Sequence, residues 1–270
     1  MSDSFTVPAH IGTIGWGYSD WNGVFYPDSV PMKQALPHYA RTFNSVEIDS
    51  SFYGTPKVAT VQNWAKSVPD NFIFCPKTPR LITHDLGLID AEEPFRHFVH
   101  TMSHLGEKRG PILIQFPPSF TASNLPDLKE FLKVLKTLED PTARFALEVR
   151  HRSLLTEELY DLLREYGIAF VSIDYDGMPR RFEVTADFVY VRLLGKHDSF
   201  MIHNKVQGER QESVEKWAGV FKKNQDRFKE LFLYSNNDYE GYSPSTSNRM
   251  KALLGLPVSE PVVDVQGSLF

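Results

Sequence analysis

Eight short apolar, β-branched segments alternate along the chain with segments of helical periodicity. Seven of the eight end in a polar or charged residue that is followed by a loop. Such alternation is typical of an α/β fold. Polar residues at the strand ends predict a parallel barrel with a polar mouth. In order, the segments are IGTIGW (11–16), VEID (46–49), FIFCPK (72–77), ILIQFPP (112–118), FALEVRH (145–151), FVSIDYD (170–176), FVYVRLLG (188–195) and LFLYSNND (231–238).

The helical segments between them complete the pattern. We expect helices at 36–43, 58–68, 92–106, 125–139, 154–167, 212–228 and 244–255. Residues 175–186 are too few and too polar for a good helix, so the helical unit after the sixth strand is expected to be degenerate. The prediction is a single TIM-type (β/α)8 barrel over 1–270, with an N-terminal extension (1–10) and a C-terminal tail (256–270). A doubly wound sheet is less favoured, because GTIGWGYSDW does not match the glycine-rich phosphate turn.

Composition narrows the classes of function. The chain has 270 residues, 41% of them hydrophobic, and a net charge of −5, which carries no global signal for nucleic acid or anionic membrane. No apolar stretch approaches the roughly 20 residues that span a bilayer. The single cysteine, Cys75, and a polar N-terminus without a signal segment predict a cytoplasmic protein. The sequence leaves the oligomeric state open.

Charged residues gather on the face that strand alternation turns inward. Glu47, Lys77, Glu148, Arg150 and Arg192 all fall on that face near one end of the barrel. Barrel interiors are usually filled by aliphatic side chains, and buried charges are costly unless they are paired. The cluster is therefore either a structural ion network or a device that orients a ligand, and both can hold together.

Seven ordered motifs carry a family resemblance over nearly the whole chain. They are GWGYSDWNGVFYP (15–27), VEIDSSFYGTP (46–56), FCPKTPRLITH (74–84), ILIQFPPSF (112–120), ALEVRHRS (146–153), FVYVRLLG (188–195) and SNNDYEGYSPSTSNRMKALLG (235–255). The chain resembles the YecE-like family, number seventy-two in the series of domains of unknown function. The resemblance implies a TIM-type barrel and no established reaction. Leu194 stands where many members carry histidine, which weakens any mechanism that needs a histidine there.

Two carboxylates are candidates for catalysis. Glu148 is the preferred general acid or base and Glu47 its partner, projecting from opposite sectors of the rim. Glycosidases use such a pair, about 5–5.5 Å apart for retention or roughly 6.5–9.5 Å for inversion. Aromatic residues that could stack on a ligand are Trp16, Tyr18 and Tyr53. Against a glycosidase, basic neighbours are expected to keep both carboxylates ionised, whereas one must be protonated.

Cations at the strand ends favour an anionic ligand. Arginine suits phosphate and carboxylate, and we expect the helix after the eighth strand to begin with Ser243 as N-cap and Pro244 next, with its N-terminus toward the mouth. The predicted contacts with an anion or its carrier are Lys77, Arg80, His84, Gln115, Arg150, Asp174, Arg192, Asn236, Asn237 and Asp238.

A metal site is less favoured. Carboxylate and imidazole groups occur at several strand ends, but neither an H-x-H nor an H-E-x-x-H spacing is present. We predict no cofactor and keep a divalent metal as the lesser alternative.

Two hypotheses remain from different classes. The first is a hydrolase- or lyase-like enzyme acting on a small or oligomeric substrate that bears phosphate or carboxylate. The second is a non-catalytic protein that binds a phosphorylated ligand or, less favoured at this net charge, nucleic acid. A glycosidase using Glu47 and Glu148 is a further alternative.

Overall fold

The computed structural model describes residues 4–261, and all eight predicted strand segments form strands in it. They are β1 (Ala9–Thr13), β2 (Ser45–Ile48), β3 (Ile73–Pro76), β4 (Ile112–Gln115), β5 (Phe145–Glu148), β6 (Ala169–Asp174), β7 (Phe188–Leu193) and β8 (Glu230–Ser235). Every pairing between them is parallel. The prediction of alternating strands and helices in an α/β fold is confirmed.

The strands form a curled arrangement of two sheets rather than one regular barrel. Six strands pair in the order β1-β8-β7-β6-β5-β4, and β2 pairs with β3. Isolated parallel bridges lie on both sides of the smaller sheet, at Ile14–Glu47, Phe74–Arg109 and Lys77–Leu113. The expected regular eight-stranded barrel is therefore not confirmed.

Side chains and prolines account for the two breaks in the ladder. Between β1 and β2 the Tyr39 hydroxyl accepts from the Thr13 amide (2.8 Å) and donates to the Ser45 carbonyl (3.1 Å). Asn44 likewise donates to Ala9 and accepts from the Ile11 amide. Between β3 and β4, Pro76 ends one strand and Pro111 precedes the other, and proline has no amide hydrogen to donate.

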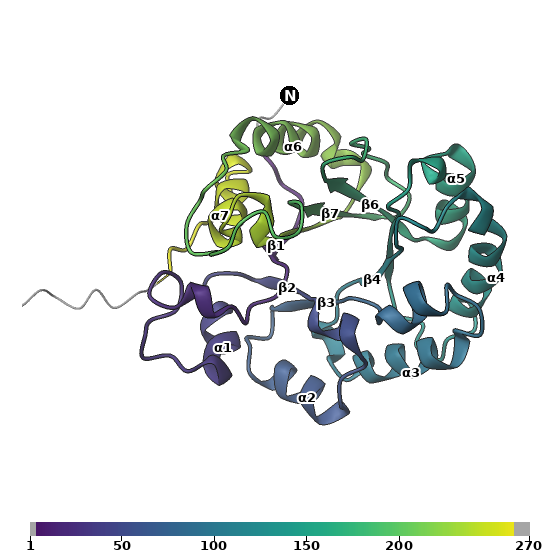
Figure 1. Cartoon of the computed structure of the whole chain (residues 1–270), viewed down its shortest axis with the longest axis horizontal. Helices are drawn as coiled ribbons and strands as arrows, with labels where there is room; N and C mark the ends of the chain where they lie inside the picture. The colour runs from purple at the N-terminus through teal and green to yellow at the C-terminus, as the bar shows by residue number, and fades with distance from the viewer. Residues whose placement is uncertain (1–3, 262–270) are drawn as a thin grey trace, which may run out of the picture.

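Seven α-helices in the described part of the chain surround the strands (Figure 1). No helix joins β6 to β7, as the short polar segment predicts. None of these helices has the length and apolar character that crossing a membrane requires. Residues 256–261 of the predicted tail form neither helix nor strand, and its remainder, like residues 1–3 of the predicted extension, lies outside the described residues. The helices are α1 (Ala35–Tyr39), α2 (Val58–Lys66), α3 (Glu92–Ser103), α4 (Leu125–Leu135), α5 (Glu157–Tyr166), α6 (Gln211–Asn224) and α7 (Ser243–Leu253).

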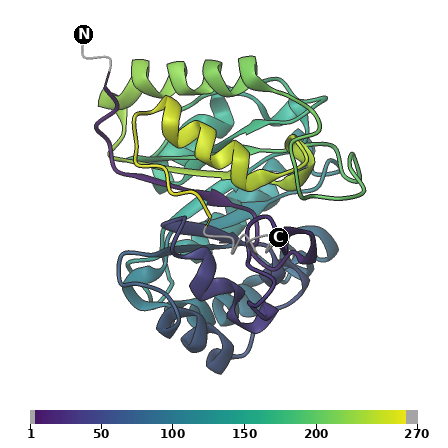
Figure 2. The same ribbon diagram turned by 90° about the vertical axis from the view of Figure 1, so that its left-hand side faces the viewer.

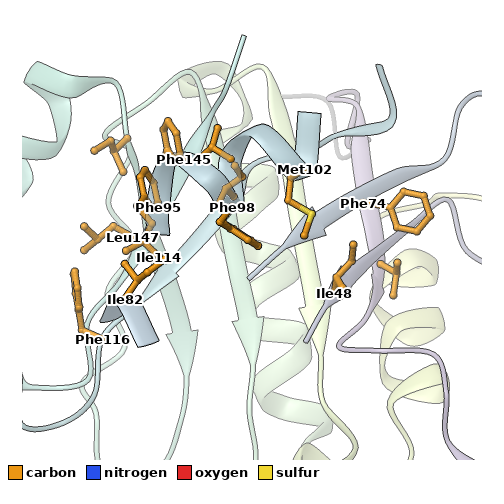
Figure 3. Close-up of a cluster of buried hydrophobic side chains, with 14 of the residues drawn as sticks. Ile48, Phe74, Ile82, Phe95, Phe98, Met102, Ile114, Phe116, Phe145 and Leu147 are labelled. Atoms are coloured by element: carbon orange, nitrogen blue, oxygen red, sulfur yellow. The ribbon is translucent and has the colours of Figure 1, made fainter. Parts of the chain in front are cut away.

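A hydrophobic layer between helices and strands leaves the opposite strand face for polar side chains. On α3, Phe95, Phe98 and Met102 are fully buried: Phe95 meets Phe145 of β5, and Met102 lies on the side of Phe74 of β3 (Figure 3). Their spacing of three and four residues places them on one face of the helix. Burial of each such side chain contributes about 1.5–3 kcal/mol. Because this layer holds the outer faces of the strands, the inner faces can carry charge.

Gly12 sets how closely β1 approaches β2. A Cβ at this position would lie 1.9 Å from the Ser45 carbonyl oxygen and 2.7 Å from the Tyr39 hydroxyl. We expect Gly12→Ala to lower the free energy of unfolding by about 3 kcal/mol, because a backbone atom has to move. Urea unfolding monitored by circular dichroism measures the change.

Gly219 is the matched control, since it lies inside α6 and a Cβ there would meet no atom within 4 Å. Gly219→Ala is expected to stabilise the protein by about 0.5–1 kcal/mol through helix propensity. Equal effects of the two substitutions would contradict the close approach of β1 and β2.

Candidate functional site

A buried guanidinium joins two buried carboxylates inside the curled sheet. Arg192 on β7 donates from Nε and Nη2 to the two oxygens of Glu47 on β2, at 3.0 and 2.8 Å. Its Nη1 donates to Oε2 of Glu148 on β5 at 2.6 Å. Both carboxylates have no exposed surface, and Arg192 is 3% exposed. The inward orientation predicted for all three residues is confirmed.

Two further donors complete this network. The Tyr190 hydroxyl donates to Oε2 of Glu47 at 2.8 Å, and Nε of Arg150 donates to Oε1 of Glu148. Every oxygen of the two carboxylates therefore has a partner, and all three nitrogens of Arg192 are used. Such complete pairing is what makes buried charges tolerable.

The two carboxyls respond in opposite directions to this environment. Burial disfavours the charged form of Glu148, but Arg150 and Arg192 outweigh it and hold its pKa at about 2, below the ordinary 4.5. At Glu47 burial prevails and raises the pKa, with Arg192 and Lys77 opposing. Desolvation is thus the larger effect on the pKa of Glu47, and the two arginine charges are the larger effect on that of Glu148.

Lys77, at the end of β3, does not pair with either buried glutamate. Its ammonium donates to Asp49 at 3.0 Å and lies 4.0 Å from the centre of the Phe52 ring. Of the three cations expected in the cluster, Arg150 and Arg192 therefore bind the buried glutamates directly, and Lys77 binds Asp49. Lys77 still lowers the pKa of Glu47 through its charge.

Arg150 has unused hydrogen-bonding capacity. Its Nε is bound to Glu148, and its guanidinium lies over the Tyr175 ring at 4.5 Å from the ring centre. Within residues 4–261, Nη1 and Nη2 have no hydrogen-bond partner, and the side chain is 16% exposed. Two contacts therefore fix the plane of the guanidinium while its outer edge remains available. Tyr175 was not among the predicted site residues, because its position carries no periodic signal.

His84 belongs to an irregular turn after β3. A hydrogen bond from the Leu86 amide to the Leu81 carbonyl (2.8 Å) makes this a π-type turn, and such turns are frequent at functional sites. The His84 ring meets the Phe52 ring edge-on at 5.0 Å, and its Nδ1 contacts the Thr83 hydroxyl. Burial, followed by the charges of Lys77 and Arg80, lowers the pKa of His84.

The remaining residues predicted for the mouth have different surroundings. Arg80 is exposed and pairs with Asp85 at 3.1 Å. Gln115 is buried, and its amide donates to the Phe116 carbonyl. Trp16 packs edge-on against Trp64, and the Tyr18 hydroxyl donates to the Ile14 carbonyl at 2.6 Å, so both serve packing. Tyr53, by contrast, is 83% exposed.

Asp174, at the end of β6, is surrounded by protein donors. Arg180 Nε donates to one oxygen at 2.8 Å, while Ser213, Trp217 and the Tyr239 hydroxyl donate to the other. The carboxylate is 2% exposed. Its contacts tie β6 to α6, so it offers no free oxygen for a ligand.

The loop after β8 is likewise occupied by internal hydrogen bonds. Asn236 accepts from the Gly195 amide at 2.9 Å, and Asp238 lies 3.4 Å from His203. Asn237 Oδ1 accepts from both the amide and the hydroxyl of Ser243.

These contacts correct the predicted start of α7. The N-cap is Tyr242 rather than Ser243, and Ser243 is completely buried with its amide already paired. Glu240, which the sequence analysis did not single out, accepts from Thr246 and Arg249 and is also fully buried. The predicted anion site at this helix N-terminus is therefore filled by the protein's own side chains.

Four residues predicted for the mouth follow the ends of β3 and β5, and we call them the cationic sector: Lys77, Arg80, His84 and Arg150. Among the described residues, no group of three or more histidine, cysteine, aspartate or glutamate side chains is arranged to hold a metal ion. A cavity of about 570 Å³ lies elsewhere, between α3 and the segment that leads to β5, and is lined by residues such as His97, His100 and Asp140. It contains none of the strand-end residues described above.

Comparison with known proteins gives one consistent family. The family model described as "Protein of unknown function DUF72" matches residues 10–266. The protein YecE of Escherichia coli K12 is 31% identical over 142 residues, which are 53% of this chain and 48% of YecE. YunF of Bacillus subtilis 168 is 30% identical over 160 residues, or 56% and 54% of the two chains. The matched region spans about half the length of these relatives.

Two solved structures share the fold over nearly their whole length. A DUF72 family protein of Thermotoga maritima MSB8 has a TM-score of 0.76 at 27% identity, covering 92% of this chain and 99% of that chain. A DUF72 family protein of Enterococcus faecalis V583 has a TM-score of 0.75 at 20% identity, covering 94% and 98%.

Glu148→Gln tests the electrostatic role of the buried network. Because the folded-state pKa of Glu148 is lowered from 4.5 to about 2, its stabilising effect is present above about pH 4.5 and is lost as the pH falls toward 2. We expect the variant to be less stable by roughly 3 kcal/mol at pH 7, with the difference closing below about pH 4.5. Urea unfolding at several pH values measures this. The control, Glu158→Gln at an exposed pair with Lys129, should show no such pH-dependent gap. If the difference in the free energy of unfolding between the wild-type protein and Glu148→Gln stayed constant with pH, its cause would be packing and not charge.

Proposed function

The chain belongs to the DUF72 family of proteins of unknown function, and from that premise we propose that it binds an anionic, phosphate- or carboxylate-bearing ligand. The ligand lies at the carboxyl ends of β3 and β5, where Lys77, Arg80, His84 and Arg150 form a cationic sector. The observation that carries this proposal is the outer edge of Arg150, whose two terminal nitrogens have no protein partner within the described residues. A planar fork of this kind matches the geometry of phosphate and carboxylate.

Electrostatics support the convergence of these side chains. Beside burial, which is the largest cause, the charges of Lys77, Arg80 and Arg150 lower the pKa of His84 and Asp85 opposes them, so all three cations act on the same ring. An anion beside His84 would be attracted to each of these three cations. Its negative charge would also offset the repulsion among them. Lys77 is 8% exposed and Arg80 lies at the surface, so the sector extends from the interior to solvent.

The buried carboxylates serve best as positioning groups for this sector. Glu47 holds Arg192, both Arg192 and Arg150 bind Glu148, and Arg150 faces the ligand. Because the Arg192 guanidinium contacts both carboxylates, it occupies the space in which a glycosidase would place the sugar and its water. We therefore do not favour the glycosidase alternative. Nucleic acid is also not favoured, since the net charge is −5 and the sector is small.

Arg150→Lys tests the anion site while it retains the positive charge. We expect inorganic phosphate to bind the wild-type protein in isothermal titration calorimetry and to bind this variant at least about tenfold more weakly, because lysine cannot form the fork. Arg210→Lys is the matched control, since Arg210 uses both terminal nitrogens on Asp176, outside the sector. If neither phosphate nor acetate binds the wild-type protein, the proposed function is wrong.

A hydrolase- or lyase-like enzyme is the second candidate, and the opposed pKa shifts of Glu47 and Glu148 favour it. A general acid and a general base in one site are often two carboxyl groups whose pKa values are shifted in opposite directions, as those of Glu47 and Glu148 are. Catalysis by Glu47 would require Arg192 to move, because every oxygen of the carboxyl now has a partner. The ligand would then be a substrate of the same anionic class.

Turnover separates the two candidates. A panel of phosphate esters and carboxylate esters should be assayed with the wild-type protein and with Glu47→Gln. If Glu47 is the acid or the base, its replacement by glutamine is expected to lower kcat by about 100-fold or more. Wild-type turnover in Glu47→Gln would exclude Glu47 as the acid. Binding without turnover of any ester would favour the binding protein.

A further inference from the structure

Exposed apolar side chains are concentrated on one end of the molecule. Among residues 4–261, large hydrophobic side chains that are more than a third exposed lie almost entirely in loops that follow the carboxyl ends of strands. They are Met32, Tyr53, Leu81, Ile89, Met201 and Ile202, with Val258 in the C-terminal segment as the exception. Single exposed apolar residues are ordinary, but their confinement to the face that holds the cationic sector indicates a use there.

Tyr53 is the member of this group that adjoins the cationic sector. Its ring is 83% exposed and meets the Phe52 ring edge-on at 5.7 Å. The Phe52 ring in turn contacts the Lys77 ammonium at 4.0 Å and the His84 ring at 5.0 Å. One aromatic ring therefore separates the exposed face of Tyr53 from two cationic-sector side chains.

The turn that carries Tyr53 is anchored to the end of β3. Ser51 Oγ donates to the Lys77 carbonyl at 2.7 Å and accepts from the Lys77 amide at 3.1 Å, and it also contacts the Ile48 carbonyl. Ser51 is completely buried. The Ser51 hydroxyl thus ties the turn that carries Tyr53 to the backbone of Lys77. A tyrosine has only two side-chain torsions to fix, so ordering its ring against a ligand costs little conformational entropy.

Leu81 adds an exposed apolar side chain on the turn that contains His84. It is 50% exposed and begins this π-type turn, three residues before His84. Tyr53 therefore comes from the loop after β2, and Leu81 comes from the loop after β3, which also holds Lys77 and His84. An inorganic anion in the sector would leave both surfaces in water.

We infer that the ligand of this site is an organic anion with a planar ring, whose phosphate or carboxylate lies in the cationic sector while the ring stacks on Tyr53. This inference rests on the proposed function and specifies its ligand class. Aromatic stacking beside a charged contact gives both affinity and orientation, and the exposed face of Tyr53 accepts any flat ring.

Calorimetric titration with phenyl phosphate, methyl phosphate and inorganic phosphate tests the inference. We expect phenyl phosphate to bind the wild-type protein about tenfold more tightly than methyl phosphate, because the stacking of one ring contributes binding free energy of this size. Tyr53→Ala should reduce that ratio to within about twofold and leave the affinity for inorganic phosphate unchanged, whereas Tyr53→Phe should retain it. Met201→Ala is the control, because Met201 is 97% exposed in the loop between β7 and α6.

Each outcome has a distinct meaning. Equal affinities for phenyl and methyl phosphate, with inorganic phosphate still bound, would overturn the ring-bearing ligand and leave the anion site intact. Equal weakening of all three ligands by Tyr53→Ala would assign Tyr53 a structural role and also overturn the inference. Failure of every phosphate to bind the wild-type protein would overturn the proposed function itself.

Discussion

The ion pair between Arg192 and Glu47 is the interaction on which the rest of this structure depends. Glu47 lies on the two-stranded sheet, whereas Arg192 and Glu148 lie on the six-stranded sheet. Regular ladder hydrogen bonds are missing on both sides of the smaller sheet, so this buried pair joins two units that the backbone joins only through isolated bridges. Removing one partner from such a pair typically costs about 3–5 kcal/mol, since the remaining charge stays buried.

The same pair determines what chemistry the interior can perform. Arg192 uses all its nitrogens on two carboxylates, and those carboxylates have no free oxygen. The network extends to Arg150, whose guanidinium is bound by Glu148 through Nε and lies over the Tyr175 ring. The charges that pair in the interior therefore also orient the Arg150 guanidinium, on which the proposed anion site depends. The long loop between β7 and α6 projects beside the start of α7, at the right of Figure 2.

The repeat of side-chain directions along the strands predicted correctly the positions of residues that depend on local periodicity. Alternation along each strand correctly turned Glu47, Glu148 and Arg192 inward, since successive side chains of a strand must point to opposite faces. It predicted the wrong N-cap for α7. That error concerns a contact from outside the helix, because Asn237 binds the Ser243 hydroxyl that a cap would use.

By itself the sequence determined the eight strands, the helices between them and the inward charges, because these follow from repeats of two and 3.6 residues. Only the tertiary structure decided which charges meet, in which direction the pKa of each buried carboxyl shifts, and which cation keeps an open edge. Those properties depend on distances between strands far apart in the chain and on the loss of solvent around them. Asp174 and Arg150 show the difference: Asp174 ends β6 and Arg150 follows the end of β5, yet packing from α6 surrounds the first, and the second is partly exposed.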